Sequence, residues 1–280
     1  MLKRTWRIDL KPEQELLLVP IGDVHYDTDE CDRERLSRFV TWVLKQEKKG
    51  KMVKLLGCGD YLDGMSPSNR RRFADMYDTT KKSFDQIMLI ELEAFAKVME
   101  PIKHCFLGLL TGHHTHTFTS DKRVGKGWGG RTSDQWLAKQ FGCDSLSDGD
   151  RMAVLLARLK FPHAQHLDVL ALHGSGGSQT PGGRVMKRIR YAEIAPTAHI
   201  VISGHDNAKV AYPRSGLDFE HGSIKRYVIG SGSFQRGYLE GQTGYAEESG
   251  LVPADLGVTV ISIQIEQRNG KWRTDYHVSV

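Results

Sequence analysis

The segments ELLLVPIGDVH, residues 15–25, and KMVKLLGCGDYLD, residues 51–63, each join a strand-length apolar run to a tight turn with glycine and aspartate. Between them, residues 32–48 carry apolar side chains at helical spacing, namely Leu36, Phe39, Val40, Val43 and Leu44. A strand, a helix and a second strand in this order predict an α/β protein.

The same alternation continues along the chain. It predicts strands at 5–10, 104–110, 166–172 and 199–203, and helices at 81–99, 132–140 and 183–194. Residues 152–161 fit either a strand paired with 166–172 or a helix. Asn269-Gly270, between apolar runs at 258–266 and 272–280, is a strong hairpin signal. We find no linker, so we expect one domain over residues 1–280, with 225–280 as a β-rich C-terminal part. Segment 231–257 stays unassigned.

Five predicted strands run into short turns that carry aspartate or histidine. Because the carboxyl ends of strands in an α/β sheet gather at one edge, these five turns are expected to meet there. A single such residue is more often a turn former or a cap, but five in order are hard to explain as turn chemistry. The turns are Gly22-Asp23-Val24-His25, Gly59-Asp60-Tyr61-Leu62-Asp63, Gly112-His113-His114, Leu172-His173-Gly174 and Gly204-His205-Asp206-Asn207.

Carboxylates and imidazoles together are the ligands of divalent transition ions. A carboxylate shared by two ions can hold them about 3.5–4 Å apart, the arrangement of two-metal hydrolases. The four cysteines, in contrast, are far apart and form no zinc-binding spacing. We therefore expect a metal site without thiolates, and reduced cysteines in a cytoplasmic protein. The first residues lack the apolar core of a signal peptide, and no apolar run has the length of a membrane span.

The order D-x-H, G-D-x-x-D, G-x-H, H and G-H resembles the signature of calcineurin-like metallophosphoesterases, over about residues 16–207. The resemblance implies two packed mixed β-sheets flanked by helices, an α/β sandwich that residues 225–280 would complete. It also implies two divalent ions, with Mn²⁺ foremost and Fe, Zn, Ni or Mg as alternatives. By the same resemblance Asp23 and His25 would bind the first ion, Asp60 would bridge both ions, and His173 and His205 would bind the second.

Two positions depart from the family pattern. His113 stands where the family has an asparagine that binds the second ion, and Asn207 stands where it has a histidine that binds the first. An imidazole nitrogen and an amide oxygen are both possible ligands. We therefore keep both residues in the ligand set, with their types exchanged between the two ions.

The resemblance also assigns catalytic roles. His114 matches the histidine that contacts the phosphate and protonates the leaving oxygen, and Asp63 would orient its neighbours as a catalytic residue without binding metal. Thr115 replaces an acidic residue that often follows this histidine. His114 would therefore either lean on another carboxylate, such as Asp63, or be a weaker acid. His116 is a reserve acid, although an exposed loop histidine is the simpler interpretation.

The resemblance predicts a metal-dependent phosphoester hydrolase. Within this class we expect a phosphodiesterase of the phage or bacterial nuclease kind. It would attack nucleic acid or nucleotides with a hydroxide that bridges the two metal ions. Basic segments at 70–72, 122–131 and 184–190 follow three of the turns, the net charge is +5, and Trp128 and Tyr191 are available for base stacking. Taken singly, each basic segment fits a solvated face better. The residues assigned to phosphate contact are Arg70, Arg71, Arg123, Arg131 and Arg184.

Two alternatives remain open from the sequence. The same site could serve a phosphomonoesterase acting on a phosphoprotein or a small metabolite. The changes at His113 and Asn207 also leave room for a degenerate phosphoesterase fold that acts as a protein-interaction scaffold. DNA, RNA or another phosphoester is the expected partner, with no membrane.

Overall fold

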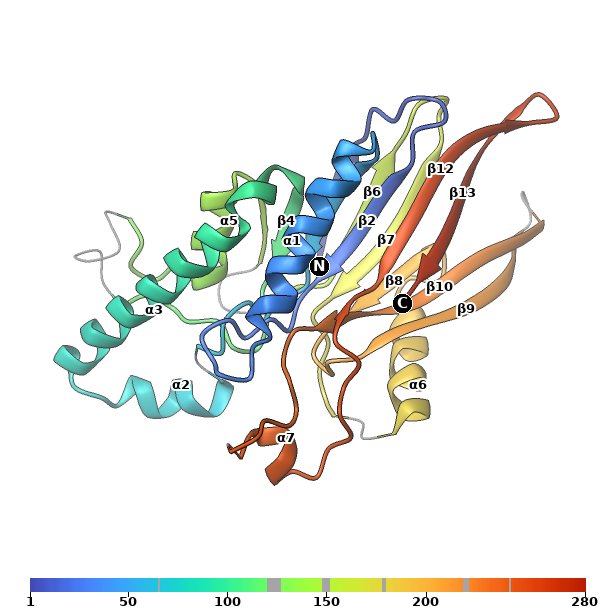
Figure 1. Ribbon diagram of the computed structural model, residues 1–280. Helices are drawn as coiled ribbons and strands as arrows, with labels where there is room; N and C mark the ends of the chain where they lie inside the picture. The colour runs from blue at the N-terminus through green and yellow to red at the C-terminus, as the bar shows by residue number, and fades with distance from the viewer. Residues whose placement is uncertain (65, 120–126, 148–151, 178–179, 219–221, 242) are drawn as a thin grey trace.

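A computed structural model of the chain describes all residues except 65, 120–126, 148–151, 178–179, 219–221 and 242. It contains two mixed sheets that pack face to face, with helices on their outer faces (Figure 1), so the predicted fold class is confirmed. The first sheet has the order β1-β6-β7-β8-β10-β11, with β9 paired to β10, and the second has the order β13-β12-β2-β3-β4-β5.

The strands of the first sheet are β1 (Leu2–Arg7), β6 (Leu155–Lys160), β7 (His166–Leu172), β8 (Ile200–Ser203), β9 (Lys209–Asp218), β10 (Gly222–Ser233) and β11 (Gly257–Val258). Those of the second are β2 (Leu16–Ile21), β3 (Met52–Gly57), β4 (Phe106–Leu110), β5 (Asp144–Leu146), β12 (Val260–Arg268) and β13 (Lys271–Ser279). Strands β2, β3, β4 and β5 run parallel, and so do β7, β8 and β10. Parallel strands place their carboxyl ends together, which brings the predicted turns to one edge.

Both faces of β2 are buried, which explains its unbroken apolar sequence. Leu17 and Val19 belong to the core between this sheet and its helices, whereas Leu16 and Leu18 belong to the core between the two sheets. Alternation along one strand therefore joins two hydrophobic cores.

The helices cover opposite outer faces of the sandwich (Figure 1). Helices α1 (Arg33–Lys48), α3 (Asp78–Met99) and α5 (Ser133–Phe141) pack on the second sheet, and α6 (Pro181–Ala192) packs on the first. The side chain of Asp32 caps α1 by accepting from the Arg35 backbone, and Thr132 and Gln135 form a capping box on α5. In the part of the chain that the structure describes, no helix is long and apolar enough to cross a bilayer.

Within the ambiguous residues 152–161, Leu155–Lys160 form strand β6, antiparallel to β7, so the hairpin alternative is confirmed. Asn269 and Gly270 form the predicted hairpin turn between β12 and β13, both with positive φ. Strand β1 begins at Leu2 and ends at Arg7, earlier than the predicted range 5–10. The unassigned segment 231–257 contains the end of β10, α7 (Tyr245–Glu248) and the start of β11.

Several elements were not predicted, and strand β5 is one of them. Helix α2 (Pro67–Ala74) has the sequence PSNRRRFA, whose few apolar residues give no helical period. The 3₁₀-helix η1 (Glu100–Cys105) includes the first two residues of the predicted strand 104–110, so β4 begins only at Phe106. Strand β9 contains Pro213 and Gly216, residues that weaken a strand prediction and that an edge strand tolerates.

Candidate metal centre

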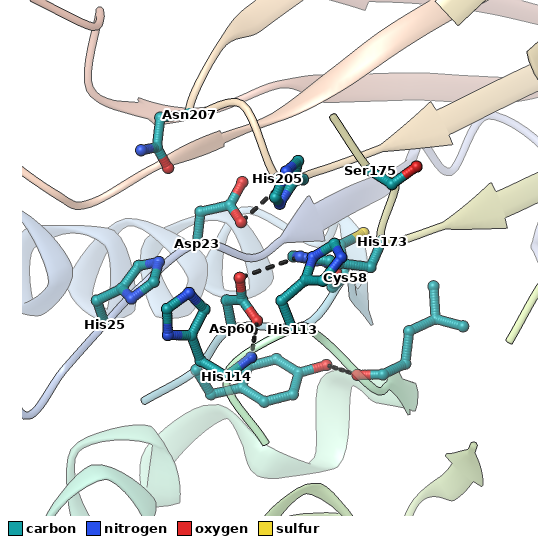
Figure 2. Close-up of polar contacts among 12 residues, drawn as sticks. Asp23, His25, Cys58, Asp60, His113, His114, His173, Ser175, His205 and Asn207 are labelled. Atoms are coloured by element: carbon teal, nitrogen blue, oxygen red, sulfur yellow. Dashed lines mark hydrogen bonds and ion pairs between the residues drawn. The ribbon is translucent and has the colours of Figure 1, made fainter. Parts of the chain in front are cut away.

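The five predicted turns meet where the carboxyl ends of strands from both sheets adjoin (Figure 2). Two groups of side chains place potential ligand atoms within 4.8 Å of one another. One group is Asp23, His25 and Asp60, and the other is Asp60, His113, His173 and His205. Asp60 belongs to both groups, so its carboxylate lies between two potential ion positions.

The turns that carry these side chains have unusual backbone conformations. Among the described residues, nine that are not glycine have positive φ, and five of the nine are Asp23, His25, Asp60, His205 and Asn207. A non-glycine residue in this region is strained, and such strain gathers where the surrounding structure must hold a side chain in place for function. The strain therefore marks the same residues that the sequence motifs selected.

Glycines allow the turns to approach one another closely. A Cβ at Gly112 would lie 2.0 Å from Oδ1 of Asp60, so no other residue fits there without moving that carboxylate. Gly59 has a φ of +94°, and a Cβ there would lie 2.6 Å from Cα of Gly112. The glycines at these two turns thus fix the position of Asp60 between the two ligand groups.

Asp23 and Asn207 are oriented by hydrogen bonds that leave one oxygen of each free. Oδ1 of Asp23 accepts from the His205 backbone N–H at 3.0 Å, whereas its Oδ2 is buried without a hydrogen-bond partner. Nδ2 of Asn207 donates to Oε1 of Gln235 at 3.1 Å, whereas its Oδ1 is also buried without a partner. Figure 2 shows Asn207 on the side of the site that holds Asp23 and His25. We define Asp23, His25, Asp60 and Asn207 as the first ligand set.

We define Asp60, His113, His173 and His205 as the second ligand set. The three imidazoles are close together, with ring centroids 4.3 Å apart for His113 and His205 and 4.9 Å apart for His113 and His173. Nδ1 of His113 is buried without a hydrogen-bond partner. Nδ1 of His173 donates to the carbonyl of Cys58 at 2.7 Å, which leaves the Nε2 lone pair for another group.

The side chains of His173 and Asp60 are in close contact inside the site. Nε2 of His173 lies 3.0 Å from Oδ2 of Asp60 without hydrogen-bond geometry. Because Nδ1 already carries the proton that binds Cys58, only a further proton or a metal cation can relieve the repulsion between Nε2 and the carboxylate. Burial lowers the pKa of His173, but the Asp60 charge outweighs it and raises the pKa to about 9, as expected for such a demand for positive charge.

The other two imidazoles are in the form that binds metals. Burial, with His173 nearby, lowers the pKa of His113 to about 4 and that of His205 to about 3. Both rings are therefore neutral at pH 7. Burial also raises the pKa of Asp23 to about 7, because the nearby imidazoles of His173 and His25 do not offset the cost of burying its charge.

The donor set fits two divalent cations. Ten buried side-chain atoms of the described residues lack a hydrogen-bond partner, although buried polar atoms in proteins nearly always have one. Four of them are Oδ2 of Asp23, Nδ1 of His113, Nε2 of His173 and Oδ1 of Asn207, and another carboxylate oxygen among the ten is Oδ2 of Asp134. All four belong to the two ligand sets, and a cation at each set would satisfy them. The residues His25, Asp63 and His114 form a third possible group, which shares His25 with the first set.

His114 and Asp63 form a pair beside the ligand sets. Nδ1 of His114 lies 2.8 Å from Oδ1 of Asp63, which is the carboxylate support considered above, and the same oxygen lies 3.0 Å from Nδ1 of His25. Burial opposes protonation of His114, but the bond to Asp63 raises the pKa of His114 to about 9. The backbone N–H of His114 also donates to Oδ1 of Asp60 at 2.9 Å. His114 thus has a partly exposed side chain with a raised pKa, and its backbone is hydrogen-bonded to the Asp60 carboxylate.

Of the arginines assigned to phosphate contact, Arg70 reaches the site. Its guanidinium donates to the carbonyl of His113 from helix α2. Arg71 is exposed on that helix, and Arg131 lies over the ring of Trp128, 5.3 Å from its centroid. The Arg184 carbonyl accepts from Arg188 on α6. Arg123 lies outside the described residues.

Two expectations about aromatic residues are wrong. Trp128 is buried in the core around α3 and α5, so it cannot stack on a base. His116 is not an exposed loop histidine, because its side chain is 1% exposed and its Nε2 lies 2.7 Å from Oδ1 of Asp85 on α3. Phe73, Phe84 and Phe118 surround its ring, and this apolar setting makes it structural. The hydroxyl of Tyr191 accepts a hydrogen bond from the backbone N–H of Ser175 and donates one to its carbonyl.

Sequence reasoning missed two supports of the site. Arg188 on α6 pairs with Asp206, the residue between His205 and Asn207. Gln235 holds Asn207 and donates in turn to Oε2 of Glu30 at 2.5 Å. Arg188 stood in a basic segment that resembled a solvated face, and Gln235 stood in the unassigned segment. In neither case does residue type or spacing signal a role.

Comparisons with known proteins leave the family open. No protein-family model matches the chain, and no curated protein does. Among solved structures, Vacuolar Protein Sorting 29 from Cryptosporidium parvum is 12% identical with a TM-score of 0.37, covering 95% of this chain and 97% of its own. Vps29 from Entamoeba histolytica, solved with Zn²⁺, is 10% identical with a TM-score of 0.36, covering 95% and 99%. A predicted phosphoesterase from Streptococcus pneumoniae is 10% identical with a TM-score of 0.30, covering 94% and 88%. At these scores the likeness says nothing about function. The functional assignment therefore rests on the geometry of the site.

Proposed function

We propose that the chain is a metal-dependent phosphoester hydrolase in which Asp60 is shared by two divalent ions. The observation that carries the proposal is the set of four buried atoms of ligand type that lack hydrogen-bond partners and lie on both sides of Asp60. When bound, two such ions supply positive charge for the phosphoryl oxygens and lower the pKa of water, so that water can act as the nucleophile. The ligand residues would be Asp23, His25, Asp60 and Asn207 for one ion, with His113, His173 and His205 completing the other set.

His114 is the proposed proton donor to the leaving oxygen. Its bond to Asp63 keeps it protonated at neutral pH, and its side chain is 26% exposed, so a substrate can reach it. Asp63 holds both His114 and His25 through one oxygen, which fixes the donor relative to the first ligand set. A proton donor matters most when the leaving group is an alkoxide, as it is in a nucleotide diester.

We further propose a phosphodiester substrate, a nucleotide or a nucleic-acid strand. Two features support this choice: the net charge of +5 and the position of Arg70 beside His113, where a guanidinium can bind a phosphate oxygen. Arg131 adds little to this support, because it lies over Trp128, a core residue.

The test is hydrolysis of bis-p-nitrophenyl phosphate and p-nitrophenyl phosphate, with Mn²⁺ added or with chelator present. We expect metal-dependent turnover that is lost in Asp60→Ala and kept in Asp255→Ala, a control at an aspartate whose side chain is 80% exposed. Faster cleavage of the diester supports the nucleotide assignment, and faster cleavage of the monoester replaces it with a phosphomonoesterase. Absence of turnover with every divalent ion and both esters contradicts the enzyme and favours a scaffold.

A further inference from the structure

From the two ligand sets we infer that the two positions select different ions, a borderline ion such as Zn²⁺ at the second set and a harder ion such as Mn²⁺ at the first. The inference rests on the two-ion site proposed above and adds the chemical class of each ion. It follows from the distribution of nitrogen and oxygen atoms between the sets.

The second set is rich in nitrogen. Three of its four side chains are imidazoles, His113, His173 and His205, and their rings are clustered within 5.3 Å between centroids. The tautomer of His173 is fixed by its bond to Cys58, so Nε2 is the atom that it offers. Imidazole suits Zn²⁺, Cu²⁺, Fe²⁺ and Ni²⁺ better than it suits Mn²⁺ or Mg²⁺.

The first set is rich in oxygen. It offers a carboxylate oxygen from Asp23, the shared carboxylate of Asp60, the amide oxygen of Asn207 and one imidazole, that of His25. Carboxylate and carbonyl oxygens are the ligands that suit Mn²⁺ and Mg²⁺.

The amide of Asn207 offers oxygen because its neighbours fix its orientation. Its Nδ2 donates to Oε1 of Gln235, and Nε2 of Gln235 donates to Oε2 of Glu30. The backbone N–H of Gln235 donates to Oγ of Ser233, whose hydroxyl donates to the carbonyl of Asp23. A reversed Asn207 would bring its NH₂ group toward the ligands and would leave the Gln235 oxygen facing another oxygen. Gln235 is therefore a positioning residue for the first set.

Selectivity here means that the ratio of Zn²⁺ affinity to Mn²⁺ affinity is higher at the second set than at the first. Most sites bind Zn²⁺ more tightly than Mn²⁺, so Zn²⁺ in excess can fill both positions. With one molar equivalent of Zn²⁺ and an excess of Mn²⁺, however, Zn²⁺ should occupy the second set, because imidazoles favour Zn²⁺ over Mn²⁺. We expect protein that has been stripped of metal, loaded in this way and passed through a desalting column to contain one Zn²⁺ and one Mn²⁺ per chain. Elemental analysis counts both ions, and electron paramagnetic resonance reports bound Mn²⁺.

Two substitutions exchange the ligand types. His113→Asn removes an imidazole from the second set and should weaken binding of the first Zn²⁺ equivalent at least about tenfold, while Mn²⁺ affinity changes by less than about threefold. Asn207→His adds an imidazole to the first set. It should let a second Zn²⁺ equivalent displace the bound Mn²⁺ at a Zn²⁺ concentration at least about tenfold lower than the wild-type chain requires.

A third variant tests the orientation of Asn207 without touching a ligand. Gln235→Leu should weaken Mn²⁺ binding about 10–100-fold, the usual effect of losing a residue that orients a ligand, and leave the first Zn²⁺ equivalent unchanged. Gln267→Leu, at an exposed glutamine on β12, is the matched control.

Three results would overturn the inference. The first is equal competition of Zn²⁺ and Mn²⁺ for both positions in the wild-type chain. The second is an equal loss of both ions in His113→Asn when circular dichroism shows that the variant is folded. The third is a chain that binds no divalent ion, which also overturns the proposed function; the first two leave the hydrolase proposal standing, because turnover of the two esters tests it separately.

Discussion

Arg188 and Asp206 form a buried ion pair beneath the turn that carries His205 and Asn207. The guanidinium donates to both carboxylate oxygens, at 3.0 and 2.5 Å, and the two side chains are 0% and 3% exposed. Lys187 adds a second contact to the same carboxylate at 3.2 Å. His205 of the second ligand set and Asn207 of the first thus flank Asp206, which Arg188 of helix α6 holds in place.

Removing Arg188 should destabilise the fold and loosen this turn. Arg188→Met leaves the Asp206 carboxylate buried with only Lys187 as a partner, and loss of one member of a buried pair costs about 3–5 kcal/mol. Urea unfolding measures the free energy, with Arg190→Met at an exposed position of the same helix as control. Equal stability of the two variants would show that the pair does not anchor the turn.

Gly112→Ala should abolish metal binding. Its Cβ would lie 2.0 Å from the Asp60 carboxylate, so the shared ligand must move. Gly182→Ala is the control, because a Cβ there meets nothing within 4 Å and its φ is not positive. Equilibrium dialysis against Mn²⁺ and Zn²⁺ compares the two, and normal occupancy in Gly112→Ala would contradict the bridging role of Asp60.

His113 and His114 are adjacent, but substitutions at the two positions should have different effects on metal binding and on activity. His113→Ala removes a ligand, so metal occupancy should fall and activity should fall with it. His114→Asn should keep both ions and lower kcat about 10²–10⁴-fold, the range of a lost general acid. The loss should be larger for an alkyl diester than for a nitrophenyl ester, whose leaving group needs no proton. A similar loss for both esters would argue against proton donation by His114.

Arg70→Met should raise the KM for a diester at least about tenfold, because a hydrogen bond to a charged group contributes about 1.5–3 kcal/mol. Arg131→Met, at the arginine over Trp128, should leave KM unchanged. Steady-state kinetics at several salt concentrations separates the two. If KM for an oligonucleotide does not rise with salt, the nucleic-acid assignment fails, since phosphate contacts release counterions.

The buried pair of Asp85 and His116 should make stability depend on pH. Burial acts to raise the pKa of Asp85, but hydrogen bonds from His116 and Thr119 hold it below its ordinary value of 3.8. A carboxylate with a depressed folded pKa stabilises the fold above its unfolded pKa, and this stability is lost as the pH falls through the folded pKa. Asp85→Asn should cost about 1–3 kcal/mol at pH 7.

Below pH 4 the difference between the wild-type chain and Asp85→Asn should therefore shrink. Urea unfolding at pH 7 and at stepwise lower pH measures it. A difference that stays constant down to acid-induced unfolding would show that the carboxylate charge contributes nothing.

The sequence predicted the elements that repeat a simple rule. The buried strands β2 and β3 and the helix α1 between them are local in sequence, and their apolar period is visible without the fold. The convergence of the candidate ligand residues was predictable, because each follows such a strand. Their grouping into a nitrogen-rich and an oxygen-rich set needed only the two exchanged residues, His113 and Asn207.

What the sequence did not predict depends on distant partners. His116 becomes structural because Asp85, on α3, reaches it within a shell of phenylalanines. Arg188 becomes buried because Asp206 lies beneath α6. Trp128 becomes a core residue because it joins the hydrophobic core that the helices form on the second sheet. A single side chain has the same local signal in either setting, so composition and spacing cannot separate them.

The two ligand sets draw side chains from both sheets, Asp23, His25, Asp60 and His113 from one and His173, His205 and Asn207 from the other. Ions held there would act as cross-links between two halves of the sandwich that are otherwise joined at this edge by hydrogen bonds such as that from His205 to Asp23. Ligand that binds only the folded chain adds stability in proportion to the logarithm of its concentration, about 2.7 kcal/mol at a hundredfold excess over Kd. The concentration of free metal would then affect the free energy of unfolding of the chain as well as its activity, and removal of metal would lower both.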